Sequence, residues 1–249
     1  CLLGLAVSLV SAVGDDSNGE FLLDRCRGLG MDVSRVRVVP GARSSSYLYI
    51  TDERGDMQLA VNDMAVCNEI SPEYLERVLP GIQAGALVLD TNLPVESLEF
   101  ICRSSCIPLY ADPVSSVKAM KLRSVMKHLR AIKPNALEAA ALTGQTDPEL
   151  AARALIDEGV QRVFISLGTN GMIAAEGSRI LRMPSPEANV VNATGAGDAA
   201  MSAIVWADLH GLSLEDSARA AQLAGAITCA SEESNAPELS RLPGLLAAE

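Results

Sequence analysis

The sequence is poor in aromatic residues and in positive charge. Only 3% of its 249 residues are aromatic, which disfavours a surface that stacks the bases of single-stranded nucleic acid. The 20 Lys and Arg stand against 31 Asp and Glu, so a nucleic-acid partner or a membrane-surface role is not expected. No uncharged apolar run reaches the roughly 18 residues that a membrane span needs. Apolar residues nevertheless make up 49% of the chain, enough for a sizeable core.

The cysteines and histidines form no recognisable site. The six cysteines lack the paired CxxC spacing of a zinc site. Cys102 and Cys106 lie four residues apart on an expected helix, which leaves a shared metal or disulfide open beside the simpler interpretation of buried thiols. The two histidines, His128 and His210, are far apart in the sequence. Scattered cysteines are typical of a reducing compartment, so a cytoplasmic location is expected.

Short apolar runs alternate with longer amphipathic stretches. The runs at 7–13, 86–90 and 162–166 are apolar on both faces, which is typical of a parallel sheet covered by helices on both sides. This alternation predicts a doubly wound α/β fold. One of the expected helices spans 116–128.

The start of the chain is also informative. It lacks an initiating Met, and Cys1–Gly4 resembles the end of a helix. We therefore expect a chain whose N-terminal part is missing.

Residues 36–63 depart from the α/β alternation. Two strands of alternating polarity, expected at 45–51 and 57–61, are joined by a glycine-containing turn at 52–56. A hairpin inserted in an α/β chain often serves as a lid or an oligomer contact, so we expect a small β-hairpin lid.

The segment Asn192–Asp198 reads NATGAGD and runs directly into an expected helix. Its glycines let the backbone approach a ligand, and the free N–H groups of the helix start suit a phosphate or a developing negative charge. Asp198 in the first turn is placed to accept a proton from an attacking hydroxyl. An ordinary glycine-rich turn with an acid that favours the helix remains the alternative.

Lys133–Glu138 reads KPNALE, a strand end followed by a helix start. Asn135 and Glu138 have the spacing of a capping box, and capping is one interpretation of the pair. The other is a ligand site at the carboxyl end of a strand, where oxygen ligands suit Mg²⁺ held through water. The segment 166–171, SLGTNG, is either a nucleotide-binding turn or a simple hairpin turn.

Together these motifs resemble the ribokinase-like (PfkB) family of carbohydrate and nucleoside kinases. The matching segments are KPNALEA, SLGTNG and NATGAGDA, with AVGDDSNG near the start. Within the family, the segments 45–64, 109–115, 190–199 and 231–240 are similar to pseudouridine kinases. The resemblance implies that residues 1–249 are one kinase domain of ribokinase-like fold, with a mostly parallel sheet, a truncated N-terminus and a lid at about 36–63.

The resemblance also implies roles for residues around the glycine turn. Asp198 would be the base that activates a sugar 5′-hydroxyl, and the backbone N–H groups of Gly195, Ala196 and Gly197 would form an anion hole. Asn192 and Thr194 lie where other members bind a monovalent cation. Asn192 replaces an Asp that is frequent in the family, which puts potassium activation in doubt.

ATP and Mg²⁺ are the cofactors that the family implies, and K⁺ is left open. Asn135 and Glu138 would organise Mg²⁺ and the phosphates. The remaining nucleotide contacts would come from Ser166, Gly168, Gly171, Thr194 and Gln222.

The expected partner is a small nucleoside or sugar. Asn92 lies where relatives contact substrate or nucleotide, and Asn62 and Asp63 would contact the base unless they only form a surface turn. The lid would also pair with its copy in a homodimer.

Three functions follow from these expectations. The first is phosphorylation of pseudouridine on its 5′-hydroxyl. The second is the same chemistry on another nucleoside or a ribose-type sugar. The third is a non-catalytic nucleotide-binding or interaction fragment, because the family's first strand and its sugar-binding Asp would precede Cys1.

Overall fold

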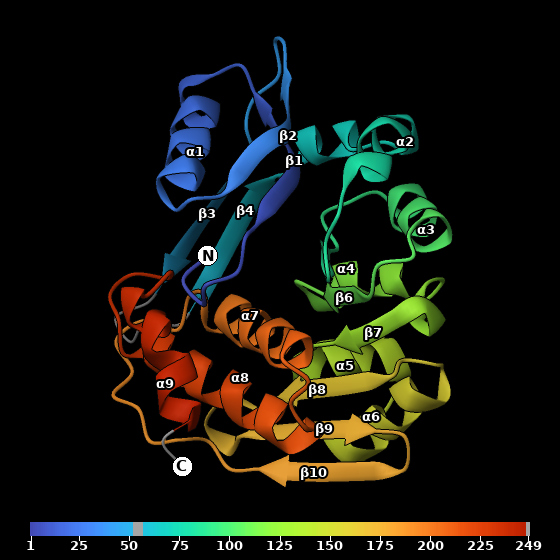
Figure 1. The fold of residues 1–249 in the computed structure, drawn as a ribbon, viewed down its shortest axis with the longest axis vertical. Helices are drawn as coiled ribbons and strands as arrows, with labels where there is room; N and C mark the ends of the chain where they lie inside the picture. Colours follow the sequence, from blue (N-terminus) through green and yellow to red (C-terminus); the bar gives the residue numbers. More distant parts are fainter. Residues whose placement is uncertain (52–56, 248–249) are drawn as a thin grey trace. The chain divides into compact units, whose positions relative to one another are not determined.

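The computed structural model describes residues 1–51 and 57–247 (Figure 1). The chain divides into two compact units. The N-terminal unit comprises Ala6–Ile82 and Asn92–Ile101, with Cys1. The C-terminal unit comprises Leu2–Leu5, Gln83–Thr91 and Cys102–Glu249. The interpretation of the whole chain as one kinase domain stays a prediction.

The N-terminal unit begins with a strand–helix–strand motif. Strands β1 (Ser8–Gly14) and β2 (Asp32–Val39) are parallel, and helix α1 (Ser17–Gly28) connects them. Asp16 caps α1 by accepting a hydrogen bond from the Gly19 N–H at 2.8 Å. The same carboxylate accepts bonds from the Ser44 hydroxyl at 2.6 Å and the Ser44 N–H at 2.9 Å. These bonds, the Ser44 hydroxyl first, lower the pKa of Asp16 to about 2.

The expected hairpin is confirmed. Strands β3 (Ser46–Thr51) and β4 (Met57–Asp63) pair antiparallel, with Leu48 opposite Val61 and Ile50 opposite Leu59. The turn expected at 52–56 lies outside the described residues. A short 3-10 turn at Ala65–Glu69 and helix α2 (Pro72–Val78) follow.

The C-terminal unit is built on a six-stranded sheet in the order β10-β9-β8-β7-β6-β5. Strands β5 to β8 run parallel, whereas β9 and β10 are antiparallel to their neighbours. The α/β class is therefore confirmed, and the expected mostly parallel sheet is a mixed one in this unit. The strand bounds are β5 (Leu87–Asp90), β6 (Leu109–Asp112), β7 (Leu129–Ile132), β8 (Arg162–Ser166), β9 (Met172–Glu176) and β10 (Arg179–Met183).

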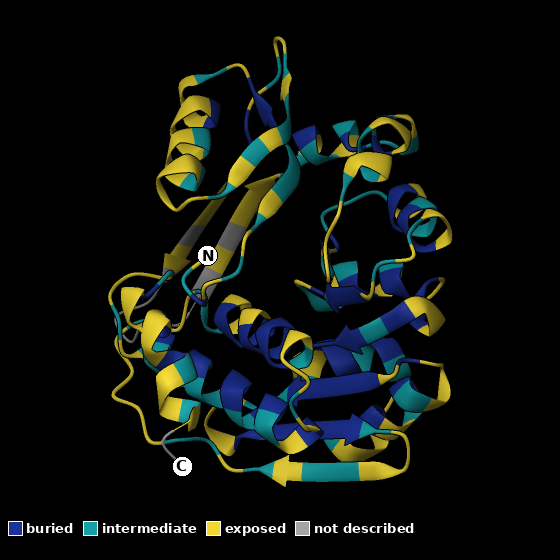
Figure 2. Cartoon of the chain, viewed as in Figure 1, coloured by how far each residue is buried: buried dark blue, intermediate teal, exposed yellow. Residues whose placement is uncertain are grey.

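Helices cover both faces of this sheet (Figure 1). Phe164 of β8 packs with Ile204 of α7 and Ala218 of α8 in one buried cluster, and β8 and β9 are almost wholly buried in Figure 2. Helix α6 contacts β8 and β9, and lies with α5 behind the sheet in Figure 1. The helices of this unit are α4 (Ser116–Ala119), α5 (Ala136–Thr143), α6 (Pro148–Asp157), α7 (Ala196–Leu209), α8 (Leu214–Cys229) and α9 (Leu242–Ala247). Helix α3 (Val95–Ser104) lies mostly in the N-terminal unit. Within the described residues, every helix is too short or too polar to cross a membrane.

Three local expectations are wrong. The stretch 116–128 is not one helix, because α4 ends at Ala119 and two 3-10 turns follow. Leu122, Val125 and Met126 are buried in this stretch. Their spacing of three and four residues also fits one face of a helix, so the periodicity does not distinguish an α-helix from the 3-10 turns that the structure contains. Cys1–Gly4 forms a turn instead of a helix end, and Cys106 lies beyond the last residue of α3. Cys102 and Cys106 are both free thiols.

Buried charge fixes the C-terminal end of α7 to the sheet. Asp208 accepts hydrogen bonds from Arg130 Nη2 at 2.7 Å and Arg162 Nη1 at 3.1 Å, and from the Tyr110 hydroxyl. Arg162 is itself buried and pairs with Glu176 at 2.7 Å. A buried arginine without an anion is strongly destabilising, so this network ties α7 to β6, β7 and β8.

We expect Asp208→Asn to lower the free energy of unfolding at pH 7 by about 3 to 5 kcal/mol, because two arginines lose their shared anion. The Arg130 hydrogen bond is the largest cause that lowers the pKa of Asp208. A carboxyl group whose pKa is lower in the folded state stabilises the protein above its usual pKa of about 4, and this contribution fades as the pH falls.

The variant's unfolding free energy should therefore depend less on pH between about 5 and 3. Urea denaturation measures both effects. Replacement of the exposed Asp157 by Asn is the control and should cost under about 0.5 kcal/mol. Equal effects of the two substitutions would contradict the role of Asp208.

Candidate active site

The glycine turn before α7 has the geometry that the sequence predicts for an anion site. Gly195 caps the helix with a φ of 85°, and Asp198 lies in the first turn. A Cβ at Gly195 would lie 2.1 Å from the Ser234 carbonyl oxygen, so only glycine fits here. The first N–H groups of an α-helix have no hydrogen-bond partner within the helix and point outward from its N-terminus. The helix dipole places partial positive charge at the same end. The turn is therefore suited to bind negative charge.

The segment that leads into this turn is tied to the end of α8. The N–H groups of Val191 and Asn192 donate to the Cys229 carbonyl at 2.7 and 3.1 Å. The Asn192 amide donates to the Glu232 carbonyl at 3.1 Å and accepts from the Thr194 N–H at 2.9 Å. Asn192 thus braces the loop with both polar atoms of its side chain. A monovalent cation at Asn192 and Thr194 stays a prediction.

Asp198 lies among other charged groups of the sheet edge. Partial desolvation raises its pKa, and the charges of Asp112 and Asp90 raise it further. Lys133 opposes this rise. The residue itself remains exposed, as a group that accepts a proton from a substrate must be. Asp198 thus combines access with a proton affinity above that of an ordinary aspartate.

The structure confirms that Asn135 and Glu138 form a capping box. Asn135 Oδ1 accepts from the Glu138 N–H at 2.9 Å, and Glu138 Oε2 accepts from the Asn135 N–H at 2.9 Å. Burial is the main cause that raises the pKa of Glu138. Each side chain keeps oxygen lone pairs of the hard type that Mg²⁺ prefers. The capping and ligand interpretations are therefore compatible.

No three His, Cys, Asp or Glu side chains converge as a metal centre within residues 1–51 and 57–247. A Mg²⁺ ion beside Asn135 and Glu138 would therefore be held by few protein oxygens, together with water and phosphate oxygens.

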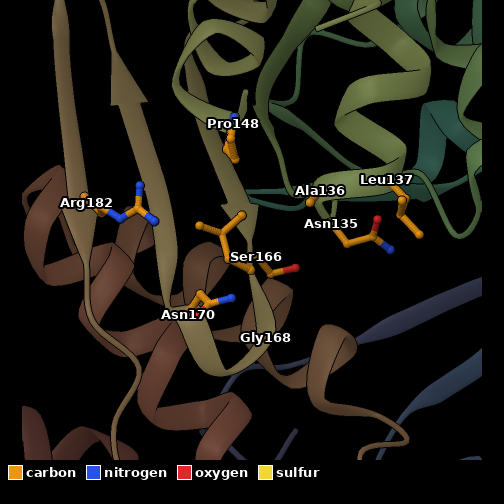
Figure 3. A pocket seen from close by; sticks show the side chains of 9 residues that line it. Asn135, Ala136, Leu137, Pro148, Ser166, Gly168, Asn170 and Arg182 are labelled. Atoms are coloured by element: carbon orange, nitrogen blue, oxygen red, sulfur yellow. The ribbon is translucent and has the colours of Figure 1, made fainter. Parts of the chain in front are cut away.

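A cavity of about 440 Å³ opens beside Asn135 in the C-terminal unit (Figure 3). It brings together the ends of β7 and β8, because Ser166 N–H donates to the Pro134 carbonyl at 3.0 Å. Figure 3 shows Arg182 of β10 across the cavity from Asn135 and Leu137. The lining residues are Asn135, Ala136, Leu137, Pro148, Ser166, Leu167, Gly168, Asn170 and Arg182.

Three of the expected nucleotide residues, Asn135, Ser166 and Gly168, thus share one cavity. Gly171 closes the loop beside it, where its carbonyl accepts from the Leu167 N–H at 2.8 Å. Gln222 is not among the residues that line the cavity and instead donates to the Pro184 carbonyl at 2.9 Å. The adenine contact expected of Gln222 stays a prediction.

The expected substrate residues belong to the N-terminal unit. Asn62 and Asp63 end β4, and Asp63 accepts from the Ala65 N–H at 3.0 Å, which is the turn role that sequence alone left open. Asn92 precedes α3. Their contact with a substrate stays a prediction.

Sequence reasoning missed three polar groups in the C-terminal unit. Lys133 and Asp112 form an ion pair at 3.1 Å at the carboxyl ends of β7 and β6. The charges of both residues act on the pKa of Asp198. Lys133 precedes the expected Asn135, and its place in that motif was the available signal. Arg182 of β10 lines the cavity, and nothing in its local sequence indicates that position.

Comparison with known proteins defines the class. The pfkB family of carbohydrate kinases matches residues 2–241, and the chain belongs to this family. It is therefore an ATP-dependent kinase of sugars or nucleosides. A solved Escherichia coli structure described as a ribokinase II shares the fold, with a TM-score of 0.85 and 19% identity over 100% of this chain and 85% of that one.

Two curated Escherichia coli proteins are more similar in sequence. The pseudouridine kinase is 36% identical over 247 residues, which cover 96% of this chain and 79% of that protein. An uncharacterized sugar kinase, YeiI, is 35% identical over 96% of this chain and 68% of its own length.

We expect Gly195→Ala to destabilise the protein and to abolish anion binding at the turn, because the added methyl group meets the Ser234 carbonyl. Gly211→Ala is the matched control, since Gly211 has a similar φ of 70° and a Cβ added there would meet no atom within 4 Å. The control should cost only the left-handed strain of about 1 to 2 kcal/mol. Thermal unfolding and ADP-release assays measure the two effects, and equal losses in both variants would contradict the steric argument.

Proposed function

We propose that this chain transfers the γ-phosphoryl group of ATP to the 5′-hydroxyl of pseudouridine. One observation carries the proposal: a kinase with that named acceptor is 36% identical across 96% of this chain. The family match at residues 2–241 includes Asp198 and the glycine turn.

The chemistry assigns a role to each part of the turn. Asp198 accepts the proton of the 5′-hydroxyl as the sugar oxygen forms its bond to the γ-phosphorus. The bond from that phosphorus to the oxygen it shares with the β-phosphate breaks, and ADP leaves. The N–H groups of Gly195, Ala196 and Gly197 stabilise the negative charge on the transferring group.

The cavity beside Asn135 is the proposed place of ATP, with Ser166 and Gly168 on the nucleotide side. A relative of the same fold was solved in complex with ATP and Mg²⁺, which supports these two ligands. Asn135 and Glu138 would hold Mg²⁺ through water. When bound, the ion would neutralise phosphate charge.

A sugar acceptor is the second candidate. The sugar kinase of 35% identity is nearly as similar as the pseudouridine kinase, so overall similarity alone does not separate the two acceptors. The test is ADP release from Mg-ATP with pseudouridine, uridine, adenosine and ribose offered separately. Turnover with pseudouridine alone is expected. Turnover with ribose and not with pseudouridine would show that pseudouridine is the wrong acceptor, although the chain would still be an ATP-dependent kinase. ATP binding without any turnover would favour a non-catalytic fragment.

Asp198→Asn should lower kcat about 10³-fold, because the amide cannot accept the proton. Its affinity for ADP should stay within about threefold, since ADP binding needs no base. Because the pKa of Asp198 is raised, kcat/KM of the parent protein should fall as the pH decreases. The midpoint of that fall should lie at a higher pH than the usual pKa of an aspartate. Near-parental turnover in the variant would remove Asp198 from the mechanism.

The β3–β4 hairpin is the proposed contact of a homodimer. Leu48, Ile50, Leu59 and Val61 form one apolar face, and each is more than half exposed. An exposed face of this kind is typical of an interaction surface, and a second hairpin is a partner of matching shape.

We expect Leu48→Glu to weaken self-association at least tenfold in sedimentation equilibrium, because it places a charge in the apolar contact. Val117→Glu is the control at a residue of the C-terminal unit that is 85% exposed. A parent protein that stays monomeric at all concentrations would end this proposal.

A further inference from the structure

Lys133 is a buried lysine beside the proposed active site, and the proposed phosphoryl transfer does not use it. Lys133 follows the last residue of β7 and is only 4% exposed. Its ammonium nitrogen lies 3.1 Å from Asp112 Oδ2. Lysine is almost never buried without a partner, because an ammonium group loses its hydration.

The partner carboxylate is itself held in place. Asp112 Oδ1 accepts from the Val114 N–H at 3.0 Å. Val114 has a φ of 65°, which is rare for a β-branched residue and costs conformational energy. The N–H of Ser115 donates to the Pro113 carbonyl at 2.7 Å and closes the same turn. One oxygen of Asp112 thus fixes a strained turn while the other holds Lys133.

The ammonium group also lies against the first turn of α7. A Cβ added to Gly197 would lie 3.4 Å from Lys133 Nζ. The ammonium group therefore lies within van der Waals range of the turn that carries Asp198. The ion pair of Lys133 and Asp112 connects the ends of β7 and β6 to the start of α7.

The charges around Asp198 are mostly negative, so the position of a nearby cation affects its pKa. The charges of two carboxylates raise the pKa of Asp198: Asp112 at the end of β6 and Asp90 at the end of β5. The charges of Asp112 and Lys133 also act on the pKa of Glu138 of α5, which Asp112 raises and Lys133 lowers. Lys133 is the cation that acts on Asp198 among these described residues.

We propose that Lys133 is a positioning residue of the kinase site, whose ammonium group, held by Asp112 against Gly197, keeps the carboxylate of Asp198 charged among its acidic neighbours. This inference rests on the proposed role of Asp198 as base. The competing interpretation is that Lys133 only neutralises Asp112 and supports the fold. The two interpretations differ in how Asp198 responds when either member of the pair is neutralised.

Lys133→Met and Asp112→Asn break the same ion pair but change the local charge in opposite directions. Loss of the cation should raise the pKa of Asp198 by about one pH unit or more, whereas loss of the anion should lower it. A purely structural pair would shift the pKa in the same direction in both variants or in neither.

The pKa is read directly in the intact folded chain labelled with carboxyl-¹³C aspartate. The Asp198 signal is assigned by its disappearance in Asp198→Asn. This titration needs no substrate, so it decides the inference even when every acceptor in the panel fails and the proposed function falls. If Lys133→Met does not fold, as shown by its thermal unfolding, Lys133→Gln removes the same charge but keeps a polar side chain, and the same rise in the pKa of Asp198 is expected.

Enzyme kinetics supply the second readout. The acidic limb of the pH profile of kcat/KM should move to higher pH in Lys133→Met and to lower pH in Asp112→Asn. Lys127→Met removes an exposed lysine just before β7 and should leave both the titration and the profile unchanged. Shifts below about 0.3 pH unit in both pair variants, or shifts of the same sign, would overturn the proposal.

Discussion

Helix α7 is held at both ends, by charge at its C-terminal end and by close packing at its start, and the arrangement of the C-terminal unit depends on that. At its C-terminal end, Asp208 receives hydrogen bonds from arginines of β7 and β8 and from Tyr110 of β6. At its start, the Lys133–Asp112 pair approaches Gly197, and Gly195 packs against the Ser234 carbonyl. Between these ends, apolar residues of α7 pack against the sheet. The helix therefore cannot shift along its axis without breaking contacts at one end.

This fixation would let a short turn serve as the proposed anion site. Backbone N–H groups are useful for catalysis only if they are oriented before the charge develops. In this chain the orientation comes from outside the turn, through the Cys229 and Glu232 carbonyls that hold residues 191 and 192. The residues that would act on a phosphate and the residues that hold them are thus separate groups.

Much of this arrangement could be predicted from local sequence. The both-face apolar run at 162–166 indicated a central strand, and the Asn135–Glu138 spacing indicated a capping box that the structure contains. The Gly-Ala-Gly-Asp segment indicated a turn followed by a helix with Asp198 in its first turn. These signals succeed because each depends on residues that are neighbours along the chain.

The remaining features depend on partners distant in the sequence. Lys133 gave no signal of burial, because its partner Asp112 belongs to another strand. Arg182 reaches the cavity only because β10 turns back beside β9. The stretch 116–128 has helical apolar spacing, yet tertiary packing of Leu122 and Met126 favours 3-10 turns. A sequence pattern shows only the periodicity of apolar residues. In this stretch, packing against the rest of the unit determined which type of helical turn formed.

The capping box has a consequence for how this chain can change over generations. Asn135 and Glu138 together satisfy backbone groups at the start of α5, and loss of an N-cap costs about 1 kcal/mol. Selection for stability alone would therefore preserve both residues in a descendant that no longer handled phosphate. Gly195 would be kept as well, because a larger residue there meets the Ser234 carbonyl. In such a lineage the exposed Asp198 would be free to change first, and the NxxE signature would outlast the chemistry.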